Sequence, residues 1–411
     1  MNDYFWVIGG GLLQVPLIHE VRTLGYRTIV TDGSEGCAAR RHADLFLPID
    51  IFDIAGHLEA ADRIVAGDER IAGVLAAGID APETMARLAT YLGLPTVNPE
   101  IAHIVNHKDQ FRQRLEQLGY PVPRYRVLDD IADVPDAVQE IGYPLIVKNT
   151  SSSGSRGTRL FHEPDLDTVT RTAEIAMNVS RSGRALIEEV WEGPEQTVET
   201  LFDVNGVFHP CFITDRIFDK SGGYALEVEL RHPTRLPADT QREMFELAES
   251  VARAFGVTIG AAKFDMLLTG QGPRIVEMTV RLSGGFDCQY LVPAATGKSV
   301  LRAAALTAVG QPFPPELLED RKHRVALSGS LWPQPGRITS ISGIEEARSV
   351  PGFEHIFFRQ AVGDVVEPYV DCTRRVCFII VSGQTEEEAR ASMEAVKERI
   401  QVLTVPHRSA A

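Results

Sequence analysis

The chain has 411 residues, of which 44% are hydrophobic and 24% charged, a balance typical of globular proteins with two or three domains. Its formal net charge of -15 argues against general binding to nucleic acid or to an anionic membrane surface. Five scattered cysteines without a CxxC pair argue against a zinc site or a disulfide framework, and Cys372 and Cys377 are interpreted as small apolar residues of a strand. No apolar run reaches the roughly 20 residues of a membrane span, and no basic segment precedes the first strand as in a signal peptide. We therefore expect a cytoplasmic, reduced protein with no nucleic-acid or membrane partner.

The first part of the chain alternates strand-like and helix-like segments. Apolar runs at Tyr4–Ile8, Tyr26–Val30 and Ile71–Ala76 predict strands, and Pro82–Leu92 predicts a helix. Strands that alternate with helices are typical of an α/β fold in which helices cover both faces of a parallel sheet.

The rest of the chain mixes strands and helices in a different order, which is typical of α+β units. An amphipathic helix is expected at about 107–118, and a long helix at Thr240–Phe255. A last segment follows the proline-rich stretch 312–315 and ends on a helix near 386–400. The other expected elements are strands at Leu145–Lys148, Arg159–Phe161, Ala185–Glu189, Val325–Leu331 and Val376–Val381, with a helix at Leu166–Met177.

A lysine at the end of a predicted strand precedes a loop of small residues. Lys148 is followed by Asn149 and then by the serine- and glycine-rich segment 150–158. Small residues let backbone N–H groups approach phosphate oxygens, and the hydroxyls and the lysine add donors and positive charge. The segment is not a Walker loop, because no GK[ST] closes it. Taken alone it fits a phosphate-binding loop and a flexible hairpin equally well.

Two acidic residues lie in apolar strand-like segments that flank a glycine turn. Asp265 and Glu277 stand on either side of the turn at 270–272 and can lie side by side across the hairpin. Adjacent carboxylates repel each other unless a cation lies between them, and Mg²⁺ prefers such ligands together with nucleotide phosphates. The alternative is a pair of solvent-facing acids, but charges among apolar neighbours usually have a partner.

A third segment, Ala185–Val190, is an apolar strand that ends in two acids, and Glu195 follows a turn. Backbone groups at the end of such a strand can bind adenine, and Glu195 can accept hydrogen bonds from ribose hydroxyls. Acids after a strand are common at protein surfaces, so this segment alone decides little.

Taken in order, these segments resemble the ATP-grasp superfamily over most of the chain. The glycines after the first strand, Asn106-His107-Lys108-Asp109 and the Tyr120-Pro-Val-Pro123 connection add to the resemblance. It implies an α/β and α+β architecture in three parts. These are a pre-ATP-grasp domain at 1–105, an ATP-grasp domain at 106–315 with a mobile lid subdomain at about 121–187, and a C-terminal α+β subdomain at 316–411.

The resemblance also implies a role for individual residues. ATP would be bound by Lys108, Lys148, Ser151, Ser152, Ser155, Glu188, Glu189, Val190 and Glu195. Asp265 and Glu277 would bind Mg²⁺, and Arg281 and Lys148 would act in catalysis. The family commonly has Asn two residues after the second metal-binding acid, whereas this chain has Thr279. The threonine hydroxyl is a shorter and weaker ligand, which leaves the number of metal ions open.

Within the superfamily, residues 222–233 and 281–286 are similar to carboxylate–amine ligases that join amino acids. The resemblance implies an ADP-forming ligase that makes a C–N bond, with ATP and Mg²⁺ as cofactors, Mn²⁺ as a substitute, and a homodimer as an allowed assembly. A small-molecule carboxylate and an amine would be the substrates. The implied substrate residues are Glu229, His232, Arg281, Gly284 and Gly285.

Three other functions remain to be compared with this one. A bicarbonate-activating carboxylase would use the same ATP site. A dinucleotide-dependent dehydrogenase is suggested by Gly9-Gly10-Gly11 and Asp32, but the GxGxxG spacing fails. A non-catalytic nucleotide sensor is disfavoured because both lysines and both metal-binding acids are present.

Overall fold

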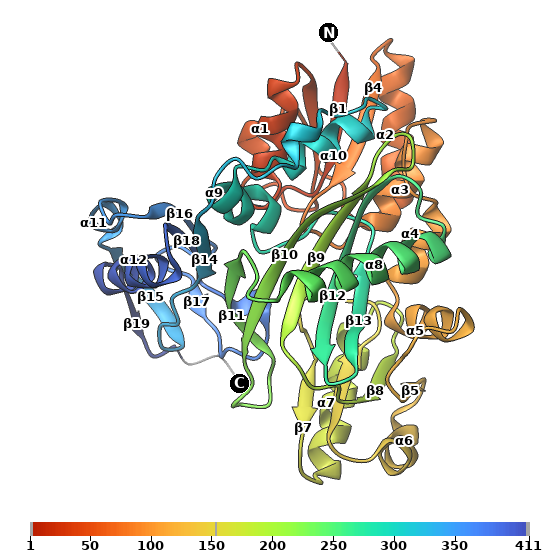
Figure 1. Ribbon diagram of the computed structural model, residues 1–411, viewed down its shortest axis with the longest axis vertical. Coiled ribbons are helices and arrows are strands. Elements are labelled where there is room, and N and C mark those ends of the chain that lie inside the picture. The colour runs from red at the N-terminus through yellow and green to blue at the C-terminus, as the bar shows by residue number, and fades with distance from the viewer. Residues whose placement is uncertain (1–2, 153, 408–411) are drawn as a thin grey trace.

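The computed structural model describes residues 3–152 and 154–407, which form four β-sheets with helices packed around them (Figure 1). Within these residues no helix is both long and apolar enough to cross a membrane.

The first sheet is parallel, as predicted for the start of the chain, with the strand order β3-β2-β1-β4. Helix α2 packs against α3, and α1 packs against α10 (Val300–Ala308), which comes much later in the chain. Residues of α10 belong to the same hydrophobic core as the strands of this sheet. The first domain is therefore completed by a helix from late in the chain. Its strands are β1 (Tyr4–Ile8), β2 (Arg27–Thr31), β3 (Leu45–Leu47) and β4 (Ile71–Ala76), and its helices α1 (Val15–Thr23), α2 (Ile54–Ala66), α3 (Pro82–Tyr91) and α4 (Pro99–Val105).

Helix α5 (Lys108–Gln117) leads into a small antiparallel sheet of order β5-β8-β6-β7, drawn at the bottom of Figure 1. Helices α6 (Val134–Ile141) and α7 (Leu166–Val179) pack on it and share a separate hydrophobic core with it. We call this unit the lid sheet. Its strands are β5 (Tyr125–Leu128), β6 (Leu145–Asn149), β7 (Arg159–Phe161) and β8 (Ala185–Glu189).

The largest sheet has eight strands in the order β13-β12-β9-β10-β11-β14-β18-β16, with neighbours antiparallel. Helix α8 (Ala238–Phe255) buries an apolar face against it. The first five strands in this order are β13 (Gly272–Thr279), β12 (Gly260–Thr269), β9 (Glu195–Phe202), β10 (Phe208–Asp219) and β11 (Leu226–His232).

The C-terminal segment continues this sheet rather than forming a detached unit. It adds β14 (Val325–Gly329), β16 (Phe353–Phe358) and β18 (Cys377–Gly383), with α11 (Ile344–Arg348) and α12 (Glu386–Arg399) packed nearby. A three-stranded sheet follows beside them, β17-β15-β19, formed by Val365–Val366, Gly336–Ser342 and Gln401–Val405. A π-helix (Asp287–Leu291) and α9 (Val292–Thr296) follow β13 and lead to α10.

Candidate active site

A cleft of about 350 Å³ lies where the lid sheet, the eight-stranded sheet and the loop after β4 meet. Its size is that of a small-molecule site. Most of the predicted residues line it, namely Lys108, Lys148, Ser152, Ser155, Glu188, Glu189, Val190, Glu195, Asp265, Glu277, Thr279, Arg281, Gly284 and Gly285.

The two predicted lysines reach the cleft from different elements. Lys108 begins α5 and its Nζ donates to the backbone oxygen of Ser152 at 2.8 Å. Lys148 extends from β6, where its Nζ donates to Oε2 of Glu188 at 2.7 Å. Lys108 thus contacts the segment that was predicted to bind phosphate, and Lys148 lines the same cleft as that segment.

Glu188 is held in an ion-paired cluster, and only 1% of its side chain is exposed. Arg112 donates to both of its carboxylate oxygens, at 2.7 and 3.4 Å, and to the backbone oxygen of Val276 at 2.7 Å. Burial alone would raise the pKa of Glu188, but the charges of Arg112 and Lys148 lower it to about 2. The carboxylate thus positions Lys148 and lies among cations.

The loop after β6 brings only part of its predicted donors to the cleft. Ser152 and Ser155 line it, whereas Ser151 is buried, with its Oγ 3.1 Å from Ser180 Oγ and accepting from the N–H of Ser182 at 3.1 Å. The prediction for the Ser151 side chain is therefore wrong. Its hydroxyl group instead holds the loop against the residues that follow α7.

The two predicted metal-binding acids are direct neighbours across the β12–β13 hairpin. Asp265 pairs in register with Glu277, and Lys263 pairs with Thr279. The register shifts immediately after Asp265. Three groups contact Oδ1 of Asp265, namely Lys263 Nζ at 2.6 Å, Arg216 Nη1 at 2.7 Å and Thr197 Oγ1 at 3.5 Å.

This environment fits a divalent cation. Burial would raise the pKa of Asp265, but Arg216 and Lys263 lower it to about 2, so the group is a carboxylate. Because the contacts fall on Oδ1, Oδ2 is the oxygen that a metal ion would take. No cluster of three or more His, Cys, Asp or Glu side chains able to hold a metal occurs among the described residues. Two carboxylates fit Mg²⁺, which commonly takes its remaining ligands from phosphates and water.

Arg281 follows β13 and lines the cleft. Its Nη1 donates to the backbone oxygen of Leu282 at 2.9 Å, and its Nη2 lies 3.6 Å from Oδ1 of Asp80. Its Nε is buried and has no hydrogen-bond partner among the described residues. The guanidinium is thus anchored from two sides and retains an unsatisfied donor.

The strand end after β8 forms another part of the wall. Glu189, Val190 and Trp191 line the cleft together with Glu195. The carboxylate of Glu195 is 2.9 Å from Nζ of Lys220, an ion pair between β9 and the end of β10.

Comparison with known proteins agrees with this geometry. Residues 107–315, just over half of the chain, match the family described as carbamoyl-phosphate synthase L chain, ATP binding domain. The chain belongs to the ATP-grasp ligases. Residues 330–405 of this ligase also match L-amino acid ligase C-terminal domain 2.

Three similar proteins illustrate the range of the ATP-grasp ligases. The L-arginine-specific L-amino acid ligase of Bacillus subtilis is 22% identical over 76% of this chain and 75% of its own length. The crystal structure of an L-amino acid ligase from Bacillus licheniformis has a TM-score of 0.82 at 20% identity, covering 98% of this chain and 99% of that one. A biotin carboxylase domain from Hydrogenobacter thermophilus, solved with MgADP and bicarbonate, has a TM-score of 0.74 at 17% identity, covering 98% and 91%. At these identities the two structures show the fold alone. The ligase spans 41% or less of the carnosine synthase and carbamoyl phosphate synthase chains that it also matches.

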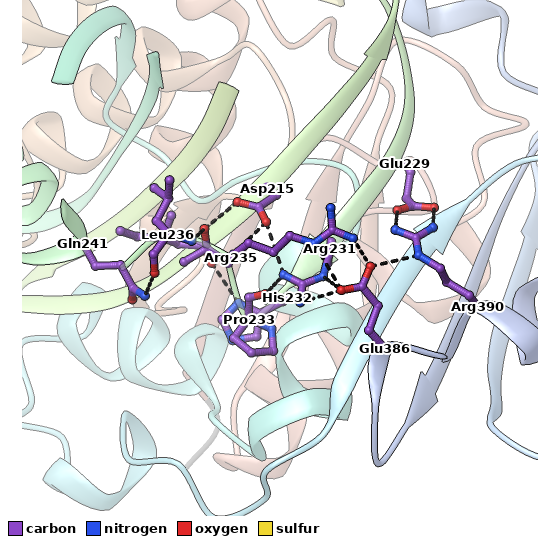
Figure 2. Close-up of polar contacts among 12 residues, drawn as sticks. Asp215, Glu229, Arg231, His232, Pro233, Arg235, Leu236, Gln241, Glu386 and Arg390 are labelled. Carbon is purple, nitrogen blue, oxygen red and sulfur yellow. Dashed lines mark hydrogen bonds and ion pairs between the residues drawn. The ribbon is translucent and has the colours of Figure 1, made fainter. Parts of the chain in front are cut away.

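Two residues predicted to bind substrate lie outside the cleft. Glu229 forms a two-pronged ion pair with Arg390 of α12, at 3.0 and 3.2 Å (Figure 2). His232 is buried, its Nδ1 lies 3.0 Å from the backbone oxygen of Ile213, and burial lowers its pKa to about 4. The predictions for Glu229 and His232 are therefore wrong.

The physical reason for the position of Glu229 is a bulge in β11. Ile217 pairs with Glu229 and Phe218 with Glu227, so one residue of β11 is left over. Strict alternation would place Glu227 and Glu229 on one face, but the extra residue separates them. Glu227 lines the cleft, where Arg216 Nε donates to it at 2.8 Å.

The C-terminal segment contributes a residue that the sequence reasoning assigned to a strand. Cys372 begins a short 3₁₀ turn, Cys372–Arg374, and lines the cleft with its Sγ 3.8 Å from Oγ of Ser155. Its N–H donates to the backbone oxygen of Gly154 at 3.1 Å. The strand prediction is wrong for Cys372, although Cys377 is buried in β18 as expected.

Several residues of the site were missed. Two of them had a signal in the sequence, because Arg112 is four residues after Lys108 on the same helix face and Lys263 is two residues before Asp265 on the same strand face. Arg216 and Asp287 had none, since only the tertiary fold brings them to the cleft.

The glycines after the first strand have a structural role. Oδ2 of Asp32 accepts from the N–H of Gly10 at 2.8 Å, and its Oδ1 accepts from Ser34 at 2.8 Å. The acid that a dehydrogenase would use for a ribose is thus occupied within its own loop, which further disfavours that function.

Proposed function

We propose that this ATP-grasp ligase joins a carboxylate to an amine through an acyl phosphate and releases ADP and phosphate. The observation that carries the proposal is a cleft in which two lysines, two facing carboxylates and an arginine meet. The match of residues 330–405 to an L-amino acid ligase domain supports amino acids as the substrate class.

We propose the division into parts at 1–105, 106–315 and 316–411, with 121–187 as the lid. The separate core of the lid sheet supports its movement as one body over bound nucleotide. The third part shares a sheet with the second, so we expect these two to move together.

In the proposed complex, Lys108 and Lys148 bind the ATP phosphates, with Ser152 and Ser155 as further donors. Backbone groups of Glu189 and Val190 bind adenine, and Glu195 accepts from the ribose. Glu188 keeps Lys148 directed into the cleft through their 2.7 Å contact. Arg112 balances the second oxygen of Glu188, so Lys148 retains charge for the phosphates.

Asp265 and Glu277 would hold Mg²⁺, or Mn²⁺ in its place, with Thr279 beside them. The bound ion supplies positive charge to the phosphoryl group during transfer. Arg216 and Lys263 keep Asp265 ionised and fix its orientation through Oδ1.

The reaction needs positioned charge rather than a covalent nucleophile on the protein. A carboxylate oxygen of the acid attacks the γ-phosphorus, and the bond to the bridging oxygen breaks to release ADP. The amine then attacks the acyl carbon, loses a proton, and the carbon–oxygen bond to phosphate breaks. Arg281 stabilises the oxyanion that forms between these events, because its guanidinium is fixed before the reaction starts.

A bicarbonate-activating carboxylase is the second candidate. The biotin carboxylase domain solved with MgADP and bicarbonate shares the fold, which supports this alternative. It predicts ATP turnover that requires bicarbonate and no organic acid.

The test is phosphate release from ATP with each of the twenty L-amino acids, singly and in pairs, with and without bicarbonate. The proposal expects ADP and phosphate with an amino acid in the absence of bicarbonate, and transfer of oxygen-18 from the acid into the phosphate. Turnover that depends on bicarbonate alone supports the carboxylase. Release of pyrophosphate contradicts the acyl-phosphate mechanism.

A further inference from the structure

One wall of the cleft carries a buried acceptor atom that lacks a hydrogen-bond partner. Asp287 is 2% exposed and Ser283 is 1% exposed, and both line the cleft. Within the described part of the chain, Oδ1 of Asp287 has no hydrogen-bond partner, and Oγ of Ser283 has only the buried carboxyl group of Glu199 beside it. A buried polar atom without a partner costs about 1–3 kcal/mol. An unpartnered carboxyl oxygen at the wall of the cleft indicates a ligand that supplies a hydrogen-bond donor.

The backbone that presents Asp287 has an unusual conformation. Gly285 and Phe286 have φ angles of 70° and 66°, and a π-helix starts at Asp287. Left-handed geometry at a phenylalanine and single π turns are both uncommon. The ring of Phe286 stacks on Phe357 at 4.4 Å and meets Phe378 edge-on at 5.0 Å. This packing against β16 and β18 fixes the position of the Asp287 carboxyl group.

The surroundings of Asp287 favour a positively charged ligand. Burial and the neighbouring carboxylates of Glu227 and Glu199 raise its pKa well above the usual value. The nearby cations are already engaged, because Lys263 and Arg216 contact Asp265 and Arg216 also contacts Glu227. A cation that enters this region therefore meets an excess of acceptors.

Arg281, which lines the same cleft, shows the opposite imbalance. The unpartnered buried atom of Arg281 is a donor, Nε, which suits an anion. Arg281 and Ser283 are two residues apart along the chain and line the same cleft. An unpartnered donor, Nε of Arg281, and an unpartnered acceptor, Oδ1 of Asp287, therefore belong to residues that line one cleft. A ligand with both a carboxylate and an ammonium group would require such a pair.

We propose that Asp287 and Ser283 form a subsite that binds the ammonium group of a substrate amino acid. An ammonium group has three N–H donors and no acceptor, which matches the acceptor oxygens of this wall. Bicarbonate has no such group. The inference rests on the proposed function and narrows its substrates to acids or amines that carry a cationic amino group. That group belongs either to the amino acid that is activated or to the amine that attacks it.

The test compares Asp287→Asn with the wild-type ligase. Three compounds are used as substrates. They are the L-amino acid that gives the fastest phosphate release from ATP in the screen above, the corresponding acid without the amino group, and the methyl ester of the amino acid. We expect the KM for the amino acid to rise about 10–100-fold, as for a lost charge-assisted hydrogen bond. The KM for ATP should change less than about threefold, and the KM for the acid without an amino group should be equal in both proteins.

The two sources of the ammonium group give different results. If the ammonium group belongs to the activated acid, removing the amino group from the substrate should raise the KM of the wild-type ligase. This rise should be as large as the rise that Asp287→Asn causes for the amino acid. If it belongs to the attacking amine, the KM for the methyl ester rises in the variant, since the ester can act only as the amine.

Asp203→Asn is the matched control, because that acid lies at the far end of β9 and is 3.1 Å from His209. Its KM values should equal those of the wild-type ligase. Ser283→Ala should raise the same KM to a smaller extent, and it tests the subsite even if Asp287→Asn does not fold. An unchanged KM for the amino acid in the folded variants, or an equal rise for the acid without an amino group, overturns the inference. Absence of any amino-acid-dependent turnover in the wild-type ligase would instead refute the proposed function.

Discussion

Two groups of charged residues in and beside the eight-stranded sheet look similar in the sequence and differ in the structure. The first group faces the cleft and includes Asp265, Glu277 and Asp287. The second group joins β10 and β11 to helix α12 of the C-terminal segment (Figure 2). There the side chain of Arg231, only 9% exposed, contacts Asp215 at 3.3 Å and Glu386 at 3.0 Å.

The difference between the groups is the number of satisfied atoms. In the second group, which we call the interface network, Arg390 contacts both Glu229 and Glu386. Arg235 donates to both oxygens of Glu386. In the cleft, Oδ1 of Asp287 and Nε of Arg281 have no partner within the described residues. We expect the saturated network to stabilise the fold and the unpartnered atoms of the cleft to contact a ligand. Substitutions in the two groups should therefore separate activity from stability.

The largest expected effect is that of Glu277→Gln. Loss of a metal-binding charge beside the transferred phosphoryl group should lower kcat by about 1,000-fold, which corresponds to several kcal/mol. Thermal unfolding should be unchanged, because glutamine keeps the shape of the side chain. The assay is phosphate release together with a melting curve. Near-normal turnover in Glu277→Gln would rule out the metal assignment.

Arg231→Met should show the reverse pattern. It removes the arginine beside the largely buried Asp215, whereas Glu386 keeps its ion pairs with Arg235 and Arg390, so the free energy of unfolding should fall by about 3 kcal/mol. The kcat of the folded variant should stay within about twofold of the wild-type value, since Arg231 does not line the cleft. Urea unfolding and phosphate release measure the two quantities. A loss of activity without a loss of stability would contradict the assignment of Arg231 to the stability of the fold.

Arg281→Ala should lower kcat by about 30–100-fold, because one preorganised donor to the oxyanion is lost. The affinity for ATP should change by less than about threefold, since the guanidinium acts on the acyl group. Titration with a non-hydrolysable ATP analogue measures the affinity. An equal loss of ATP affinity and turnover would assign Arg281 to the nucleotide instead.

The smallest effect is the pH dependence of the interface network. Hydrogen bonding to Arg235 and the other nearby arginines lower the pKa of Glu386 to about 2 from an ordinary value near 4.5. Its contribution is therefore complete above about pH 4.5 and is lost as the pH falls toward 2. Because these groups are partly exposed, the contribution should be below about 1 kcal/mol. Urea unfolding of the wild-type ligase and of Glu386→Gln should converge over this pH range, and a constant difference would contradict the assignment.

The sequence predicted the residues of the site best where local geometry decides their position. Asp265 and Glu277 lie on two strands joined by a short turn, so the strand period and the turn together make them neighbours. Lys148 follows from the end of an apolar strand, and the bounds of β4, β7 and β8 were predicted without error. Arg112 could have been found from its spacing to Lys108.

Prediction failed where distant segments or a register change decide the outcome. A single extra residue in β11 sends Glu229 to α12 and Glu227 to the cleft. No local pattern indicates that Phe357 and Phe378 hold the turn before Asp287, because those strands follow it by about 70 to 90 residues.

By itself the sequence determined the class of fold and the bounds of several strands, because periodicity, turns and hairpins are local properties. Its resemblance to the ATP-grasp superfamily indicated which residues would bind ATP and Mg²⁺. Only the tertiary structure decided which charges are satisfied by one another and which remain for a ligand. That distinction depends on contacts such as those of Arg231 with Glu386 and of Lys263 with Asp265, and on the missing contact of Asp287. Hydrogen bonds and ion pairs act over a few ångströms, so their partners are set by the packing of distant segments rather than by their order along the chain.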